Sequence, residues 1–178
     1  MMANVDDPSL DDVKRRVIAA VCTLYRRDRE LLDVDVNERS ITHKLAEYLQ
    51  SEFPCWHVDC EYNRLGSEVK RLRRNFAYSD PADTEAITVF PDIIVHRRKT
   101  SRNLLVIEVK KATGRGDMED VEKLKAFTQV HEYKYKYGLF LKIGPIDNLE
   151  LKLYENGSES CDWSSDLRHA LKELGYDT

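Results

Sequence analysis

Two stretches of sequence decide the fold: FPDIIV at residues 90–95 and LVIEVK at residues 105–110. Runs of isoleucine, leucine and valine of this length are typical of buried β-strands. Asp92 opens the first run, and Glu108 precedes Lys110 by two positions near the end of the second. Charged side chains inside strands this apolar require an explanation.

The two-residue period of a β-strand explains these charged side chains. Side chains at positions i and i+2 of a strand share a face, so Glu108 and Lys110 project together while Ile107 and Val109 enter a core. A pair of strands also brings Asp92 next to Glu108, although they are distant in sequence. Two carboxylates and a lysine on one side of a sheet indicate a metal site that handles phosphate.

Hydrophobic periodicity predicts the surrounding elements. Helical spacing predicts helices near residues 9–31, 38–53, 118–135 and 163–174. Apolar or alternating runs predict strands near residues 56–62, 87–95, 104–109, 137–143 and 149–154. The polar stretch 63–83 is expected to form a loop or an irregular hairpin. The two decisive strands should form an antiparallel hairpin, and a later crossover should add a further strand. The expected fold is α/β, with a central mixed sheet flanked by helices.

Composition bounds the function. A chain of 178 residues with 42% apolar and 34% charged residues is expected to be one globular domain, residues 1–178. A formal charge of −4 excludes a uniformly basic nucleic-acid coat but leaves room for a local basic groove. The sequence shows no signal peptide, membrane span or CxxC pair, so we expect a cytoplasmic protein with reduced thiols and no membrane partner.

Hydrolysis of a phosphodiester requires a hard divalent cation, oxygen ligands and a group that positions the attacking water. Carboxylates supply the ligands and leave coordination positions open for phosphate and water. A lysine orients the water and stabilises charge that develops on the phosphate. Asp92, Glu108 and Lys110 together provide this set.

The pair Pro91-Asp92 with Glu108-Val109-Lys110 resembles the PD-(D/E)xK, or restriction-endonuclease-like, nuclease superfamily. The resemblance covers a core of about residues 38–143. It implies a restriction-endonuclease-like sheet and a magnesium ion, replaceable by manganese, held by Asp92, Glu108 and the Val109 carbonyl. It also implies that Lys110 assists the water. Members of the superfamily cut DNA and, less often, RNA.

Many members of the superfamily add an acid from the helix before the sheet, and Glu38 is the best match to that position. It lies on the apolar stripe of its predicted helix, three residues before Ile41. The other interpretation is a first-turn acid that favours the helix dipole. Glu47 lies off the stripe, and Glu61 is the rival if the third carboxylate comes from the first strand.

Candidate nucleic-acid contacts lie outside the acidic set. Arg71, Arg73 and Arg74 belong to a basic run that could follow a phosphate backbone without reading sequence. Gln129 begins a QxxxY pattern similar to one in RecB-like members of the superfamily, and an exposed glutamine on a charged helix is the alternative. Lys123 on the same helix has a similar status. The basic turn 97–102 is expected to be solvated and distant from Glu108.

Three functions remain open. The first is a divalent-metal-dependent nuclease, with DNA favoured over RNA as its substrate. The second is a nucleic-acid-binding or assembly module on the same fold with little or no cleavage. The third is an ordinary α/β interaction domain in which the motif is a coincidence. Two kinds of protein partner fit a chain of this size: a recognition partner, or a second copy that allows both strands to be cut.

Overall fold

A computed structural model describes residues 7–33, 37–62, 64–65, 68–69, 71–73, 86–88, 90–129 and 133–176. Its helices are α1 (Leu10–Asp33), α2 (Glu38–Glu52), α3 (Asp117–Gln129) and α4 (Ser164–Glu173), with a 3₁₀ turn at Ile146–Asn148. Six strands form the main sheet: β1 (His57–Cys60), β6 (Ile93–His96), β7 (Asn103–Lys111), β8 (Tyr137–Ile143), β9 (Glu150–Glu155) and β10 (Ser158–Asp162). Two small hairpins pair β2 (Arg64–Leu65) with β3 (Glu68–Val69) and β4 (Arg71–Arg73) with β5 (Ala86–Thr88).

The main sheet is open and mixed, with strand order β1-β6-β7-β8-β9-β10. β6 and β7 pair antiparallel, as the short turn between them predicts. β7 and β8 pair parallel, with α3 as the crossover between them. The remaining neighbours are antiparallel. The predicted α/β class and mixed sheet with helices packed on it are therefore confirmed.

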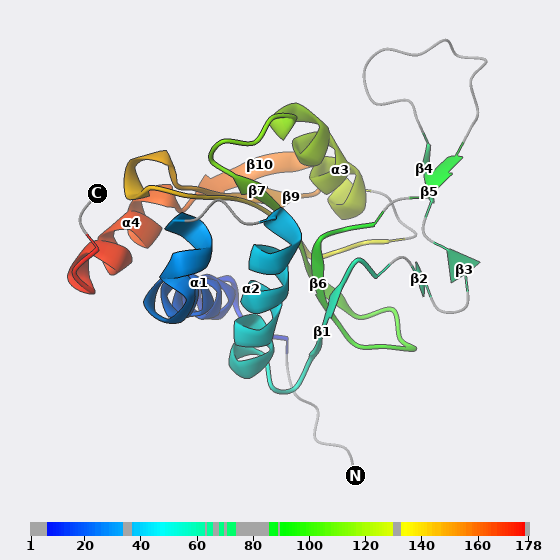
Figure 1. Cartoon of the computed structure of the whole chain (residues 1–178). Coiled ribbons are helices and arrows are strands. Elements are labelled where there is room, and N and C mark those ends of the chain that lie inside the picture. Colours follow the sequence, from blue (N-terminus) through cyan, green and yellow to red (C-terminus); the bar gives the residue numbers. More distant parts are fainter. Residues whose placement is uncertain are drawn as a thin grey trace.

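Helices cover both faces of this sheet (Figure 1): α1, α2 and α4 lie on one side and α3 on the other. The alternation along β7 divides its side chains between the two layers. Ile107 and Val109 join the core under α1 and α2, whereas Val106 packs beneath α3 with Phe127. Glu108 has the parity of Val106 and therefore faces the α3 side.

Local sequence explains where the helices begin. The Ser9 hydroxyl accepts a hydrogen bond from the Asp12 backbone N–H at 3.2 Å, as expected at the start of α1. Asn37 caps α2 in the same way by accepting from the Arg39 backbone N–H at 3.0 Å. The cap fixes Glu38 as the first residue of α2, directly beside the end of β7.

The structure differs from the prediction at the end of one helix and at one additional strand. The helix predicted to reach Tyr135 is α3, described as Asp117–Gln129. Tyr135 does not continue it, because its backbone N–H donates to the Phe127 carbonyl at 3.1 Å. The rings of Tyr133 and Tyr135 pack against Phe127 at centroid distances of 5.6 and 5.9 Å. Strand β10 was not predicted, because its sequence SESCD is polar and it lies at the sheet edge.

Part of the stretch expected to be a loop or irregular hairpin is described, and it contains β2, β3 and β4. Its other residues, including Arg74, lie outside the described part of the chain. Among the residues that the structure describes, no helix is both long enough and apolar enough to cross a membrane.

Tyr25 links the helical layer to the end of the sheet. Its hydroxyl donates to the Gly144 carbonyl at 2.6 Å and accepts from the Gly144 N–H at 3.2 Å. Replacing it by phenylalanine leaves both backbone groups without this partner. We expect Tyr25→Phe to lower the free energy of unfolding by about 1–3 kcal/mol. Urea denaturation measures this difference, and an unchanged midpoint would show that water replaces the hydroxyl without loss.

Candidate active site

The β6–β7 register brings the two central carboxylates together. Ile93 pairs with Ile107, so the next position outward sets Asp92 opposite Glu108. Asp92 Oδ2 accepts a hydrogen bond from the Val109 backbone N–H at 2.7 Å, which fixes its carboxylate across the end of the hairpin. The structure thus places side by side the two acids that the sequence predicts to face one another.

Glu108 is unusually buried for an acid. Its side chain is only 2% exposed, and its Oε1 atom has no hydrogen-bond partner. Burial raises its pKa well above the ordinary value, and the neighbouring charge of Asp92 raises that pKa further. The positive charges of Lys123 and Lys110 lower the pKa and oppose this shift only in part. Glu108 therefore holds an unpaired oxygen in a place where charge is poorly solvated.

Asp92 shares this environment. Burial raises its pKa to about 6, and the charges of Glu38 and Asp120 act in the same direction. The hydrogen bond from Val109 lowers the pKa but does not compensate for the burial. Two carboxylates that resist ionisation side by side make a site that a cation would stabilise.

Lys110 is held by an acid that sequence reasoning did not identify. Its Nζ lies 2.7 Å from Asp120 Oδ2, and Lys123 Nζ lies 3.0 Å from Asp120 Oδ1. Asp120 is 6% exposed. It stands four residues before Leu124 and seven before Phe127, both buried, so helical spacing was the signal that could have found it.

The Asp120 contact also determines the charge of Lys110. Burial alone lowers the pKa of this lysine, but the hydrogen bond and the charge of Asp120 outweigh burial and raise it above the ordinary value. Lys110 is therefore an ammonium ion at neutral pH. It can donate hydrogen bonds and stabilise negative charge, but it cannot act as a general base.

Of the three candidates for a further acid, Glu38 comes nearest to the pair. Its Oε2 accepts from the Lys111 backbone N–H at 3.1 Å, and its charge acts on both Asp92 and Lys110. Glu61 lines the same groove as Asp92 but is exposed and paired with Arg39 at 3.1 Å. Glu47 is exposed, and its carboxylate contacts Lys44 and His43.

The structure does not bring Gln129 to the carboxylates. Asp120 marks the end of α3 nearest Lys110, and Gln129 lies nine residues further on, about 13 Å along the helix axis. Its side chain instead approaches Gly157 in the turn between β9 and β10. Gln129 therefore does not help to hold the carboxylates, and its contact with nucleic acid stays a prediction. Lys123 lies beside the site through Asp120.

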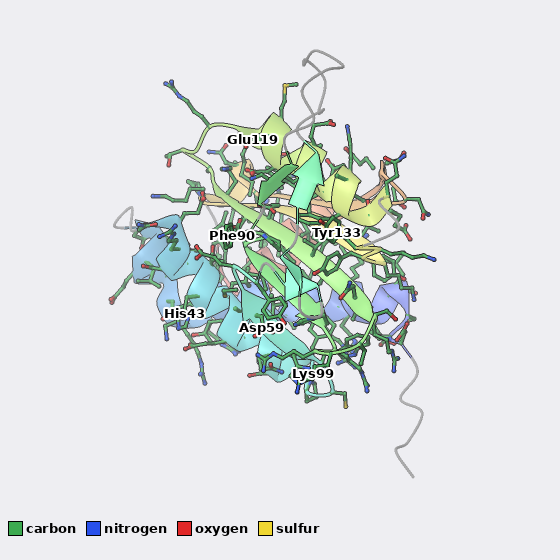
Figure 2. The ribbon with its side chains drawn as sticks, turned by 90° about the vertical axis from the view of Figure 1, so that its right-hand side faces the viewer. His43, Asp59, Phe90, Lys99, Glu119 and Tyr133 are labelled. Atoms are coloured by element: carbon green, nitrogen blue, oxygen red, sulfur yellow. The ribbon has the colours of Figure 1, made fainter. Side chains whose placement is uncertain are left out.

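The basic candidates are less informative. Arg71 and Arg73 lie in β4, of which only the backbone is described, and Arg74 lies outside the described residues. The turn at residues 97–102 lies at the far end of the hairpin from Glu108, as expected. Figure 2 shows Lys99 of this turn at the opposite end of the view from Glu119 of α3.

The oxygen atoms present fit a hard divalent cation. Within the described part of the chain, no three histidine, cysteine, aspartate or glutamate side chains are grouped so that they could hold a metal ion alone. The expected set needs only Asp92, Glu108 and the Val109 carbonyl, and it leaves further positions to water and phosphate. The unpaired buried Oε1 of Glu108 is the observation that favours an ion there.

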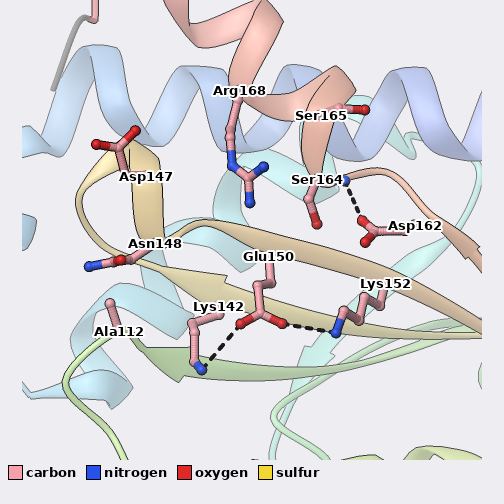
Figure 3. A pocket seen from close by; sticks show the side chains of 10 residues that line it. All are labelled: Ala112, Lys142, Asp147, Asn148, Glu150, Lys152, Asp162, Ser164, Ser165 and Arg168. Carbon is pink, nitrogen blue, oxygen red and sulfur yellow. Dashed lines mark hydrogen bonds and ion pairs between the residues drawn. The ribbon is translucent and has the colours of Figure 1, made fainter.

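A separate hollow of about 760 Å³ adjoins this region (Figure 3). Three acidic side chains line it. Glu150 lies 3.4 Å from Lys142 and 3.1 Å from Lys152, Asp162 accepts from the Ser164 N–H at 2.8 Å, and Asp147 is exposed. The sheet register sets Lys142 beside Lys110. The hollow therefore lacks unpaired buried carboxylates. Its Lys142 serves as a neighbouring lysine for comparison with Lys110.

Comparison of the sequence with protein-family models and with curated proteins found no match. The functional argument therefore depends on the geometry of the site.

The raised pKa of Asp92 has a consequence for stability. An unfolded aspartate has a pKa of about 3.9, so the folded chain binds this proton more tightly and loses stability as the pH rises from about 4 through about 6. Asp92→Asn removes the titration and keeps an oxygen that can accept from Val109. In a chelating buffer, we expect the variant to gain melting temperature over the wild type at pH 7.5 but not at pH 4.

Exposed Asp147 offers a matched control. The melting temperature of Asp147→Asn, measured by circular dichroism over the same pH range, gives the effect of replacing one exposed carboxylate by an amide. An Asp92→Asn curve parallel to the wild-type curve would show that Asp92 carries no such penalty.

Proposed function

We propose that this protein is a divalent-metal-dependent nuclease that hydrolyses phosphodiester bonds, with DNA as the preferred substrate. The observation that carries the proposal is the buried Glu108 carboxylate, which has an unpaired oxygen, faces Asp92 and lies two residues before a lysine held as an ammonium ion. A structural role alone gives no reason to bury an acid with an unpaired oxygen next to a second acid.

The residues divide into two groups. Asp92, Glu108 and the Val109 carbonyl would hold Mg²⁺ or Mn²⁺. Glu38, whose Oε2 accepts from the Lys111 backbone N–H, would add negative charge beside the ion rather than complete a three-carboxylate group. The ion would supply Lewis-acid polarisation of the phosphodiester and charge neutralisation at the carboxylates. Lys110 orients the attacking water through its ammonium group and stabilises negative charge that develops on the phosphate.

Asp120 acts through Lys110 as a positioning residue. Its two oxygens bind Lys110 and Lys123, so one buried acid sets the position of both ammonium groups beside Glu108. The ion pair between Asp120 and Lys110 also supports the second candidate function, a nucleic-acid-binding or assembly module. In that ion pair the Lys110 ammonium group, which cleavage requires, is already bound to a carboxylate. Cleavage assays separate the two functions.

Cleavage of labelled DNA and RNA in Mg²⁺ or Mn²⁺ tests the nuclease directly. We expect Asp92→Ala to abolish metal-dependent cleavage, because it removes a ligand. Lys110→Ala should slow cleavage by about 10²–10³-fold, the loss typical of removing one donor to the transition state. Lys142→Ala, on the neighbouring strand, is the matched control and should cleave as the wild type does. Cleavage that persists in both Asp92→Ala and Lys110→Ala would show that these residues do not have the proposed catalytic roles.

Asp120→Asn tests the positioning role. It keeps the shape of the side chain but loses the charge that holds Lys110, so we expect kcat to fall by about 10- to 100-fold with KM unchanged. Manganese affinity, measured by titration calorimetry, should stay near the wild-type value. Equal losses of metal affinity and of rate would instead indicate that Asp120 shapes the metal site.

A further inference from the structure

An aromatic ring lies exposed beside the candidate site. Phe90 is 51% exposed, although it directly precedes the buried Pro91 and the site residue Asp92. Met118 and Leu174 are the other large apolar side chains exposed in the described part of the chain. Of these three, Phe90 alone lines the groove that contains Asp92.

This groove has a volume of about 650 Å³ and reaches from the start of α2 to the end of β1. Figure 2 shows Phe90 in a view that sets it between Glu119 of α3 and His43 of α2. The proline that follows Phe90 has a fixed φ, and the Asp92 carbonyl accepts from the Glu61 N–H at 3.1 Å. The ring is thereby attached by a short, constrained segment to the carboxylate that the proposed function places at the phosphate.

The charges of the groove do not by themselves attract a phosphate backbone. Glu38, Glu61 and Asp92 line it, together with Arg39 and His43. Arg39 is already paired with Glu61 at 3.1 Å, and His43 Nε2 lies 3.4 Å from Glu47 Oε1. A nucleic acid in this groove would therefore need a favourable contact that does not depend on surface charge.

We propose that Phe90 is a stacking platform for an unpaired base, and hence that the substrate is single-stranded DNA or a single-stranded segment of a larger DNA. The inference rests on the proposed function. Stacking of a base on an aromatic side chain is worth about 1–3 kcal/mol and tolerates any sequence. Inside a duplex both faces of a base are covered by its neighbours, so stacking on the ring would first require unstacking a base step, at a cost of a few kcal/mol. An unpaired base offers a face without that cost.

The surroundings of Phe90 favour a base over a protein partner. The centre of a protein interface is depleted in charged residues and groups several apolar anchors. Around Phe90 the groove is instead lined by charged and polar side chains such as Glu38, Arg39 and Thr42. A single ring among charged groups suits a ligand with one flat apolar face and a polar backbone.

Fluorescence anisotropy of the whole chain tests this proposal. Labelled single-stranded DNA, single-stranded RNA of the same sequence and the matching DNA duplex are titrated with Ca²⁺ in place of Mg²⁺, so that binding is read without turnover. We expect Phe90→Ala to weaken single-strand binding by about 5- to 150-fold and to leave duplex binding unchanged. Phe90→Trp should retain binding, and Met118→Ala, which removes an exposed side chain of α3, should have no effect.

A 2-aminopurine base placed along the single strand gives the direct signature, because stacking on Phe90 should quench its fluorescence and Phe90→Ala should restore it. Single-strand binding that is absent, insensitive to Phe90→Ala, or weakened no more than duplex binding would overturn the proposal. Single-stranded RNA bound more tightly than DNA of the same sequence would overturn the assignment of DNA as the substrate.

Cleavage assays in Mg²⁺ separate this inference from the proposed function. If Lys110→Ala loses cleavage but Phe90→Ala binds single strands as the wild type does, the stacking role of Phe90 is wrong and the nuclease proposal stands. If the wild-type chain cleaves neither DNA nor RNA but quenches 2-aminopurine in a manner that depends on Phe90, the stacking role stands and the nuclease proposal is wrong.

Discussion

The burial of two adjacent carboxylates is the constraint on which the rest of the site depends. A buried ionised acid is unfavourable unless it is paired and hydrogen-bonded, and Glu108 has an oxygen that is neither. The protein compensates in part. The Val109 N–H supports Asp92, while Lys110 and Lys123 place positive charge near Glu108. The raised pKa of both acids shows that this compensation is incomplete, and a divalent cation is the simplest group that would complete it.

The sheet makes the arrangement possible because alternate residues of strand β7 point to opposite faces, so one set can fill the core while the other set forms the site. Alternate residues of β7 fill the core beneath α1 and α2, and the intervening residues Glu108 and Lys110 face α3. Each helical layer then adds one acid near the end of that strand. Glu38 of α2 accepts a hydrogen bond from the Lys111 backbone N–H, and Asp120 of α3 forms an ion pair with Lys110. The site therefore lies where both layers meet the ends of β6 and β7, rather than within either layer.

Sequence reasoning predicted the parts of this site that follow from local rules. The strand period and the short turn were enough to place Asp92 opposite Glu108, and helical spacing with the resemblance selected Glu38 over Glu47. The polar edge strand β10 was missed because it lacks an apolar pattern. Tyr133 and Tyr135 were placed in α3 because helical periodicity does not show that both rings pack back against Phe127. Asp120 was missed because its role depends on how α3 sits on the sheet. The exposure of Phe90 likewise depends on the folded surface around it.

A crystal structure of the protein grown with saturating Mn²⁺ tests the central claim most directly, since anomalous scattering identifies the ion without reference to activity. We predict one ion bound by Asp92 and Glu108, with oxygen distances of about 2.0–2.6 Å, the range that magnesium and calcium sites span. The Oε1 atom of Glu108, unpaired without the ion, should then have a partner. Crystals that contain no ion between these carboxylates, or hold it only on exposed acids such as Glu61, would contradict the claim.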